Sequence, residues 1–292
     1  NKSLPHGYRG FGRFSFIKFA NRCFWDTTYK SKKESKNYRY QIEITKDNLN
    51  AYDPINLMET KERTGTSVSF GFDGMEQMAI LTDRDERIPL SHIINKIALE
   101  FCWVIELLGI KININDKELD YSFLIEKKET DKIKVDNEEF EFKFIKWKTQ
   151  LKSEYSKYYL IDSENKEAFV DTTLLNNKGD DFYHSLYVKG GYFDKFEFLK
   201  TRYEDTYNNL IEIINKFLRN KRKPYLEIFS NNKFKEFEEK NLLPKFSSFE
   251  ESTKKPIYKE VVREVIEFAP SLVSSKFAND DQRKVLLQLI NK

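Results

Sequence analysis

Three glycines near the start of the chain have a spacing that suits the binding of an anion. Gly7, Gly10 and Gly12 stand three and two positions apart, and Arg13 follows them directly. Glycine adopts positive φ without a steric penalty and lets the backbone approach an anion closely. Where such a turn opens a helix, the first unpaired N–H groups add a partial positive charge. The pattern predicts either a phosphate-binding turn or a structural turn before a buried helix, and the spacing alone leaves both open.

Two common phosphate-binding motifs are incomplete at this position. A Walker A loop needs Gly-Lys-Ser or Gly-Lys-Thr, and neither follows Gly12. A Rossmann fingerprint needs a preceding strand and an acidic residue that closes a βαβ unit about 20 positions later. The sequence offers neither of these, so a nucleotide site here has to be of another kind.

Positive charge gathers at the same end of the chain. Residues 1–46 hold 11 Lys and Arg but only 3 Asp and Glu, whereas the net charge of the whole chain is only +3. A local positive excess suits an anionic ligand, and it equally suits an ordinary solvated face. The small net charge is not that of a protein that binds nucleic acid over its whole surface.

The composition predicts a folded protein of about two domains. The chain has 292 residues, of which 39% are hydrophobic and 15% aromatic, enough for packed cores. Cys23 and Cys102 lack a Cys-x-x-Cys partner, so we expect buried free thiols in a reducing, cytoplasmic compartment. No apolar run approaches the ~18 residues of a membrane span, so we expect no membrane partner.

Hydrophobic periodicity predicts a helix and then strands in the first third of the chain. Apolar residues at helical spacing indicate a helix over Phe11–Phe24. Clean alternation indicates a strand over Tyr38–Thr45, and residues 47–63 look polar and irregular. We also expect strands over Cys23–Tyr29 and after Gly65, a helix capped by Ser91 and Gly109, and a strand that turns at Asn115–Asp116.

From about residue 119 the sequence alternates between strands and polar turns. The expected strands are "FEFKFIKW", "KYYLID", "EAFVDTTLL" and "FYHSLYV". A helix is expected over "YNNLIEIINKFLRN", with its end before Pro224 and the cations of "RNKRKP" at its C-terminus. In the last helix Leu286, Leu287 and Ile290 form an apolar face that we expect to meet a partner or a continuation of the chain.

The order of these elements resembles the nucleotide-binding fold of the GHKL ATPases, the superfamily of gyrase, Hsp90, histidine kinases and MutL. In that family a GxxGxG box ends the ATP lid and opens a helix, and a later Gly-Thr pair opens a strand beside the adenine. Gly7, Gly10, Phe11 and Gly12 match the first box, and Gly65 and Thr66 match the second. The resemblance implies an α+β chain that begins with part of a GHKL sandwich, a mixed sheet with helices on one face.

The resemblance also implies a ligand and the residues that meet it. The ligand is ATP, with backbone N–H groups near Gly10 and Gly12 at the phosphates, Arg13 beside them, and Thr66 close to the adenine. Gyrase-, Hsp90- and MutL-like members send a lysine or arginine back to the γ-phosphate from a transducer domain. Lys178, in a polar turn between two expected strands, is the candidate for that role, and Arg13 and Lys189 are its competitors.

Several boxes of the family are missing from this sequence. We find no helix that carries the catalytic Glu and the Mg²⁺-binding Asn, and no DxGxG loop for the adenine amino group. Because the chain begins with Asn rather than Met, we expect these boxes before Asn1, in a longer gene product. This chain alone then does not hydrolyse ATP by the family's mechanism, since it lacks the general base and the metal ligand.

The resemblance divides the chain into three parts. Residues 1–118 correspond to the C-terminal part of the ATP-binding domain, 119–200 to a transducer-like α+β domain, and 201–292 to a mostly helical region with no specific match.

The remaining candidate residues have plainer interpretations. His6 lies beside the glycine box, where a phosphate contact stays open. His92 opens a helix and is expected to be structural. A triad of Asp180 or Asp181, His184 and Ser185 is excluded, because adjacent residues of one strand point to opposite faces.

Two functions of different classes follow. The first is an ATP-dependent conformational switch, with ATP and Mg²⁺ as cofactors, homodimerisation, and a protein partner at the helical C-terminal region. The second is a non-catalytic module that binds protein or nucleic acid on a degenerate fold of this type. The sequence leaves the output open among chaperone action, DNA handling and defence.

Overall fold

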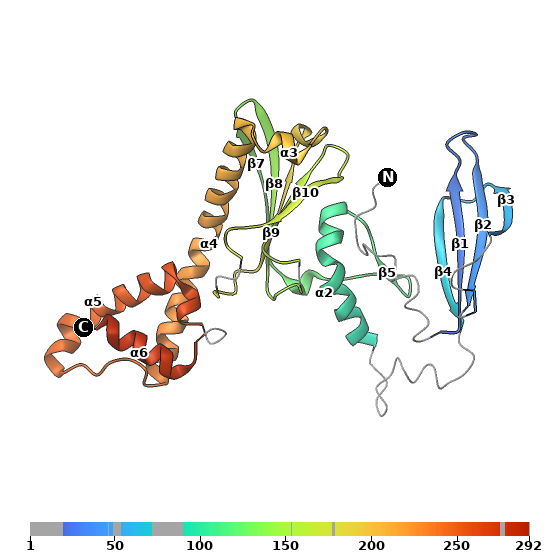
Figure 1. Ribbon diagram of the computed structural model, residues 1–292. Coiled ribbons are helices and arrows are strands. Elements are labelled where there is room, and N and C mark those ends of the chain that lie inside the picture. Colours follow the sequence, from blue (N-terminus) through green and yellow to red (C-terminus); the bar gives the residue numbers. More distant parts are fainter. Residues whose placement is uncertain are drawn as a thin grey trace. The chain divides into compact units, whose positions relative to one another are not determined.

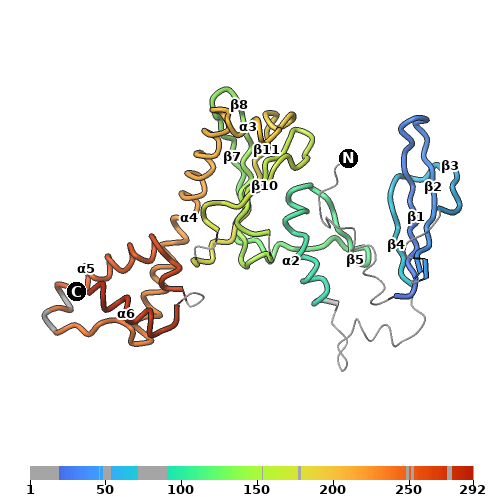
Figure 2. Tube along the Cα trace, viewed as in Figure 1, coloured from blue at the N-terminus to red at the C-terminus, as the bar shows by residue number. Residues whose placement is uncertain are grey.

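The computed structural model of this protein describes residues 20–45, 47–48, 54–71, 90–152, 154–176, 179–274 and 278–291. The chain divides into two compact units, Asn1–Ile93 and Ile94–Lys292, and each has its own sheet (Figures 1 and 2). The α+β class predicted from the sequence is confirmed. No helix among the described residues is long and apolar enough to cross a membrane.

The first unit is a four-stranded antiparallel sheet with the strand order β3-β2-β1-β4. Its strands are β1 (Arg22–Lys30), β2 (Asn37–Thr45), β3 (Ile55–Thr60) and β4 (Gly65–Gly71). The predicted alternation positions the sheet, because Trp25 on β1 lies opposite Ile42 on β2 and Val68 on β4. These side chains pack against a small buried cluster of Ala20, Cys23 and Ile44, so one face of the sheet is apolar.

Two expectations for this unit are wrong. The helix predicted over Phe11–Phe24 does not include its last three residues, because Arg22–Phe24 begin strand β1, and its residues before Ala20 lie outside the described part. Strand β3 falls in a segment expected to be irregular. Its apolar side chains Ile55, Leu57 and Met58 are about half exposed, so it carries no burial pattern, and backbone pairing with β2 alone defines it.

The second unit has a five-stranded mixed sheet, in the order β10-β9-β11-β8-β7, between helices. Strands β9 and β11 pair in parallel, and the other neighbours are antiparallel. Its elements are α2 (Leu90–Leu108), β5 (Asn113–Ile114), β6 (Lys117–Glu118), η2 (Ser122–Leu124), β7 (Ile125–Val135), β8 (Glu138–Trp147), β9 (Lys157–Ile161), β10 (Glu167–Thr172), β11 (His184–Lys189), η3 (Gly191–Phe193), α3 (Phe198–Thr201), α4 (Asp205–Glu239), α5 (Ser248–Phe268), η4 (Pro270–Leu272) and α6 (Asp280–Ile290).

Strand β8 directs the two faces of this sheet toward different helices (Figure 1). Phe140, Phe142 and Phe144 are fully buried in a cluster with the first half of α4. On the other face Lys143 reaches the C-terminal turn of α2, where its Nζ donates to the carbonyl of Glu106 at 2.7 Å. The predicted end of α2 is confirmed, because Gly109 has a φ of +63° and its N–H donates to the carbonyl of Ile105.

Helix α4 continues through Pro224, where we expected it to end. Proline removes one intrahelical hydrogen bond and usually kinks or ends a helix. Here the helix packs on both sides of that position. Tyr207, Leu210, Ile214 and Leu218 pack on the sheet, and Phe234 and Phe237 lie in a second cluster with α5 and α6. Tertiary packing therefore outweighs the local cost of the proline.

The C-terminal helices form a small core of their own. Leu287 of α6 is fully buried there, and Leu286 and Ile290 pack against it. The hydroxyl of Tyr258 on α5 donates to the carbonyl of Leu287 at 2.9 Å. The apolar face of the last helix thus meets α4 and α5 of the same chain, which corrects the expectation that it awaits a partner.

Replacing Phe142 with alanine tests the importance of the β8 face. Phe142 is fully buried, and its ring centroid lies 5.3 Å from that of Phe217 on α4. We expect Phe142→Ala to lower the free energy of unfolding by about 3–5 kcal/mol, since it leaves a cavity between sheet and helix. Urea unfolding measures the change. Phe123→Ala, at a side chain that is 43% exposed, is the control, and an equal loss for both variants would contradict this account of the core.

Candidate functional site

Gly65 and Thr66 begin strand β4, so their positions in the first unit are defined by pairing with β1. Thr66 lies opposite Thr27, and the two hydroxyl oxygens are 3.1 Å apart. Alternation places Thr66 on the same face as Val68, which packs against the apolar cluster of the sheet. The Thr66 side chain is itself exposed, so its hydroxyl lies at the open end of an apolar face.

Gly65 has no structural reason to be glycine in the described part of the protein. Its φ is not in the left-handed region, and a Cβ placed on it would meet no described atom within 4 Å. A glycine inside a strand weakens it and often marks a place where a ligand or another backbone comes close. Gly71, at the other end of the same strand, differs, because a Cβ there would lie 2.7 Å from the Arg22 side chain.

The opposite face of this sheet carries a polar group that the sequence did not point out. The Arg39 guanidinium donates to both oxygens of Asp26, at 2.7 and 2.5 Å, and Gln41 donates to the same carboxylate at 2.8 Å. These hydrogen bonds lower the pKa of Asp26 to about 2. The three residues lie on neighbouring strands in register, so the group ties β1 to β2 on the face away from Thr66.

The other predicted nucleotide-binding residues lie outside the described residues. These are Gly7, Gly10, Phe11, Gly12, Arg13 and Lys178. The chain on both sides of Lys178 is described and firmly held. Leu175 belongs to the core between the sheet and α4, and Asp180 pairs with Arg222 of α4 at 2.5 Å. The Asp180 and Arg222 side chains are only 3% and 10% exposed. Leu175 before Lys178 and Asp180 after it are therefore both anchored in the fold.

Lys189, the competitor of Lys178, lines a cavity of about 220 Å³ at the C-terminal end of α2. Its Nζ donates to Oδ1 of Asn165 at 2.6 Å. Glu106 lies in the same cavity and accepts hydrogen bonds from Tyr121 at 2.9 Å and Lys128 at 2.8 Å. Burial alone would raise the pKa of Glu106, but the hydrogen bonds from Lys128 and Lys143 outweigh it, and the pKa is lowered.

This cavity is a poor place for a phosphate. Glu106 and Glu141 line it together with Lys143 and Lys189, and the last carbonyl groups of α2 add the partial negative charge of a helix C-terminus. The charges of the lining are therefore balanced, and the cavity offers no positive excess that would attract an anion.

His184 and Ser185 point to opposite faces of β11, as the sequence predicted. The Nε2 and Nδ1 atoms of His184 lie 3.0 Å from the Thr173 hydroxyl and 2.9 Å from the Phe182 carbonyl oxygen. Ser185 instead accepts a hydrogen bond from the Trp147 indole at 2.9 Å. Burial lowers the pKa of His184 to about 4, so the ring is neutral and structural rather than part of a triad.

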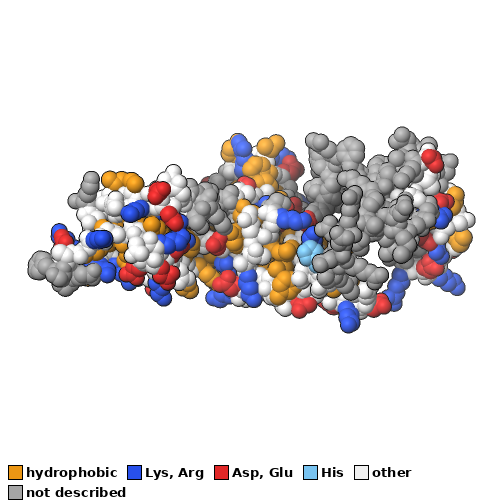
Figure 3. All heavy atoms as spheres, turned by 90° about the horizontal axis from the view of Figure 1, so that it is seen from below, with side chains coloured by type: hydrophobic (Ala, Val, Ile, Leu, Met, Phe, Trp, Pro, Cys, Tyr) orange, Lys and Arg blue, Asp and Glu red, His pale blue; other side chains and the backbone are white. Residues whose placement is uncertain are grey.

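Two cations of the basic run "RNKRKP" are bound within the protein. Lys221 pairs with Glu129 at 2.5 Å and Asp131 at 3.3 Å on β7, and Arg222 pairs with Asp180. The expectation that these cations lie at a helix C-terminus is wrong, since α4 continues to Glu239. On the face shown in Figure 3, described side chains of both signs are interspersed with apolar ones, which does not favour a nucleic-acid surface there.

Comparisons with known proteins give little beyond this geometry. No protein-family model matches the chain, and no curated protein matches it. Among solved structures the chain is similar to the 43K ATPase domain of Thermus thermophilus gyrase B in complex with an aminocoumarin, at 16% identity and a TM-score of 0.27. The match covers 62% of this chain and 58% of that one, less than two thirds of its length. A likeness of this size decides neither the fold nor the function of this chain.

The described residues do not form a metal-binding site. Among them, no group of three or more His, Cys, Asp or Glu side chains lies close enough to hold a metal ion. Cys23 and Cys102 are both buried free thiols, which confirms the prediction for them.

The buried state of His184 predicts a pH dependence of stability. Its pKa is about 4 in the folded protein and about 6.5 in an unfolded chain, so the unfolded state binds a proton first as the pH falls. The stability that neutral His184 contributes is complete above about pH 6.5 and is lost as the pH falls toward 4, by up to roughly 3 kcal/mol.

Urea unfolding of wild type and His184→Gln between pH 7 and pH 4.5 tests this. The difference in unfolding free energy should shrink as the pH falls, because glutamine takes up no proton. His92→Gln, at an exposed histidine, should track the wild type throughout. A wild-type minus His184→Gln difference that is the same at both ends of the range would show that His184 is not held neutral.

Proposed function

We propose that this chain forms part of an ATP-dependent conformational switch of the GHKL type. It contributes the end of the ATP lid, through Gly7, Gly10, Phe11, Gly12 and Arg13, and the strand beside the adenine, through Gly65 and Thr66. Nucleotide binding is coupled to homodimerisation or to remodelling of a protein partner. The observation that carries the proposal is the position of Gly65 and Thr66, an unexplained glycine followed by a hydroxyl at the end of an apolar sheet face.

The chemistry of that face suits a purine base. A base needs apolar walls and a small number of polar groups that fix its orientation. Val68 and Trp25 supply apolar surface on this side of the sheet, and the Thr66 hydroxyl supplies a group that donates or accepts one hydrogen bond. The open space at Gly65 leaves the backbone accessible at the same strand end.

The residues present fit contacts to the adenine of a nucleotide, and they do not fit the hydrolysis of its phosphates. A bound Mg²⁺ would neutralise phosphate charge, but the family's Asn ligand and general base have no counterpart in these 292 residues. The proposal therefore assigns binding and transmission to this chain, and no water-activating step.

In this proposal, the segment that carries Lys178 transmits nucleotide binding to the C-terminal helices. We assign Lys178 to the γ-phosphate on the strength of the resemblance. The connection from Lys178 to Asp180 is short, and Asp180 is held by Arg222 in the middle of α4. The same helix continues to Phe234 and Phe237 in the C-terminal core. A change at the nucleotide would thus reach the C-terminal helices along one continuous element.

The alternative is a non-catalytic interaction module on a degenerate fold of this type. It agrees with the missing catalytic boxes, and it predicts that the complete gene product binds no ATP. A binding measurement with a non-hydrolysable ATP analogue separates the two functions, and absence of binding together with an unchanged oligomeric state would exclude the switch.

Thr66 and its neighbour Thr27 give a matched pair of variants for the adenine contact. In the complete gene product, Thr66→Val should weaken binding of the ATP analogue about tenfold, since one hydrogen bond to the ligand is lost. Thr27→Val breaks the same Thr27–Thr66 hydrogen bond but keeps the Thr66 hydroxyl, and should bind normally. Isothermal titration calorimetry measures both. Equal affinities of the two variants would remove Thr66 from the site.

Alanine variants of Lys178 and Lys189 test which of the two lysines contacts the γ-phosphate. Lys178→Ala should leave ATP affinity nearly unchanged and lower the rate of hydrolysis at least tenfold, because the contact forms to charge that develops during the reaction. Lys189→Ala should have a normal rate, since Lys189 already donates a hydrogen bond to Asn165 in a cavity whose charges are balanced. Steady-state ATPase assays of the complete gene product decide between them, and a slowed Lys189→Ala with a normal Lys178→Ala would reverse the assignment.

A further inference from the structure

Two basic segments meet at one end of the sheet in the first unit. They are residues 30–36, which contain the turn between β1 and β2, and residues 59–63, which end β3 and lead to β4. Both lie at this end because Asn37 pairs with Lys30 on β1 and with Thr60 on β3. Together the two segments hold six Lys and Arg against three Glu, a net charge of +3, and we call them the basic end of the sheet.

The three glutamates of the basic end each have a polar partner on β2 or in the turn. The pairs are Glu59 with Lys36 at 2.8 Å, Glu62 with Arg39 at 3.2 Å, and Glu34 with the Tyr38 hydroxyl. The exposed cations of the basic end that form no ion pair with another described residue are Lys30, Lys32, Lys33, Lys61 and Arg63. The basic end therefore offers an anionic ligand several side chains whose charge no carboxylate neutralises.

A cluster of three tyrosines adjoins the basic end. Tyr29 lies opposite Tyr38 on β2, with ring centroids 6.1 Å apart, and the centroid of Tyr40 lies 5.8 Å from that of Tyr29. The cluster lies at the opposite end of the sheet from the buried apolar residues around Cys23, and Tyr29 is 41% exposed. Aromatic rings open to solvent beside unpaired lysines are the combination that binds single-stranded nucleic acid.

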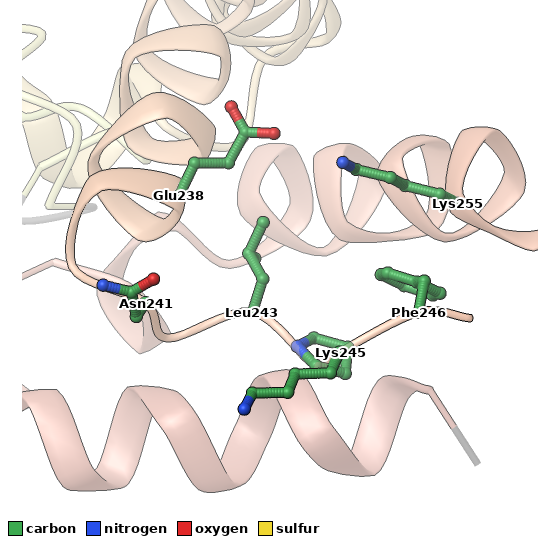
Figure 4. A pocket seen from close by; sticks show the side chains of 7 residues that line it. Glu238, Asn241, Leu243, Lys245, Phe246 and Lys255 are labelled. Carbon is green, nitrogen blue, oxygen red and sulfur yellow. The ribbon is translucent and has the colours of Figure 1, made fainter. Parts of the chain in front are cut away.

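The pocket at the loop between α4 and α5 shows no such preference (Figure 4). It has a volume of about 460 Å³, and Leu243 and Phe246 supply apolar surface. Glu238 lies beside Lys255, so charges of both signs line the pocket. Its lining selects neither an anion nor a cation, whereas the basic end carries an excess of one sign.

We propose that the basic end and the tyrosine cluster together bind single-stranded nucleic acid. The lysines of the turn contact successive phosphates, and a base stacks on the exposed ring of Tyr29. The bases of a duplex are stacked on one another, so a duplex offers the tyrosine no free base. Phosphate charge and a ring face are common to DNA and RNA, so strands of both kinds fit, with little preference for sequence. This surface goes beyond the proposed ATP switch and needs neither ATP nor Mg²⁺.

Fluorescence anisotropy of the full chain without ATP tests the proposal, with labelled oligothymidine and oligouridine of about 12 nucleotides as probes. The double variant Lys32→Glu, Lys33→Glu should weaken binding roughly tenfold or more. It should also reduce the slope of log affinity against log salt by about 1.4, since each phosphate contact to a single strand contributes about 0.7. The matched control is Lys216→Glu, Lys235→Glu, at two exposed lysines of α4. It changes the net charge by the same amount and should bind normally.

The stacking contact has a different signature from the phosphate contacts. Tyr29→Leu should weaken binding about tenfold and leave the salt slope unchanged, because a lost stacking contact releases no counterions. Tyr29→Phe keeps the ring and should bind like the wild type. Lys32 and Lys33 are exposed, so their double variant tests the surface without a change in the packing of the sheet.

Several outcomes would overturn the proposal. They are a wild type that binds neither strand, a duplex bound as tightly as a single strand, equal losses in the two double-lysine variants, and a Tyr29→Leu variant that binds like the wild type. Binding to vesicles of anionic phospholipid, without binding to either strand, would assign the basic end to a membrane surface instead. Tighter binding of oligouridine or of oligothymidine would support the proposal and identify RNA or DNA as the preferred strand. Because ATP is absent throughout, the result is independent of the proposed ATP switch.

Discussion

The second unit depends on the two-sided burial of strand β8. Three successive positions on one face of this strand are Phe140, Phe142 and Phe144, and their rings fill the space under α4, while Lys143 on the other face holds the end of α2. Because successive side chains point to opposite faces, a shift of the strand by one residue would exchange the rings and the lysine. Two helices from distant parts of the sequence are thereby fixed on one sheet.

Buried charges then define where those helices sit along the sheet. Glu106, with a side chain only 3% exposed, is paired with Lys128 and Lys143, and Asp180 is paired with Arg222. Removing one partner from such a pair costs several kcal/mol, because a buried charge is left uncompensated. The apolar clusters set how closely the helices approach, and these pairs set their register.

Features with a strong local pattern were predictable from the sequence, and features decided by distant contacts were not. The alternation in β2 and the apolar repeat in α2 gave the correct elements, and Gly109 gave the correct helix end. Strands β3 and β7 were missed, since the first is exposed and the second alternates charged residues with few apolar ones. Pro224 led us to predict a helix end, because a proline usually ends a helix and the nearby sequence does not reveal the C-terminal core that holds α4 together beyond it. The partners of Lys221 and Arg222 lie about 40 to 90 positions away, so the basic run looked like a helix terminus or a nucleic-acid contact.

Pro224 lies close to the point where the packing of α4 changes from the sheet to the C-terminal helices. The residues of α4 that pack with the sheet end near Tyr225, and those that pack with the C-terminal helices begin near Phe229. Because proline has no N–H, the hydrogen bond to the carbonyl of Asn220 is missing at Pro224, near the end of the first group. Arg222, held by Asp180, lies just before that point. Under the proposed switch, a displacement of Asp180 would therefore reach α4 through Arg222, two residues before the proline.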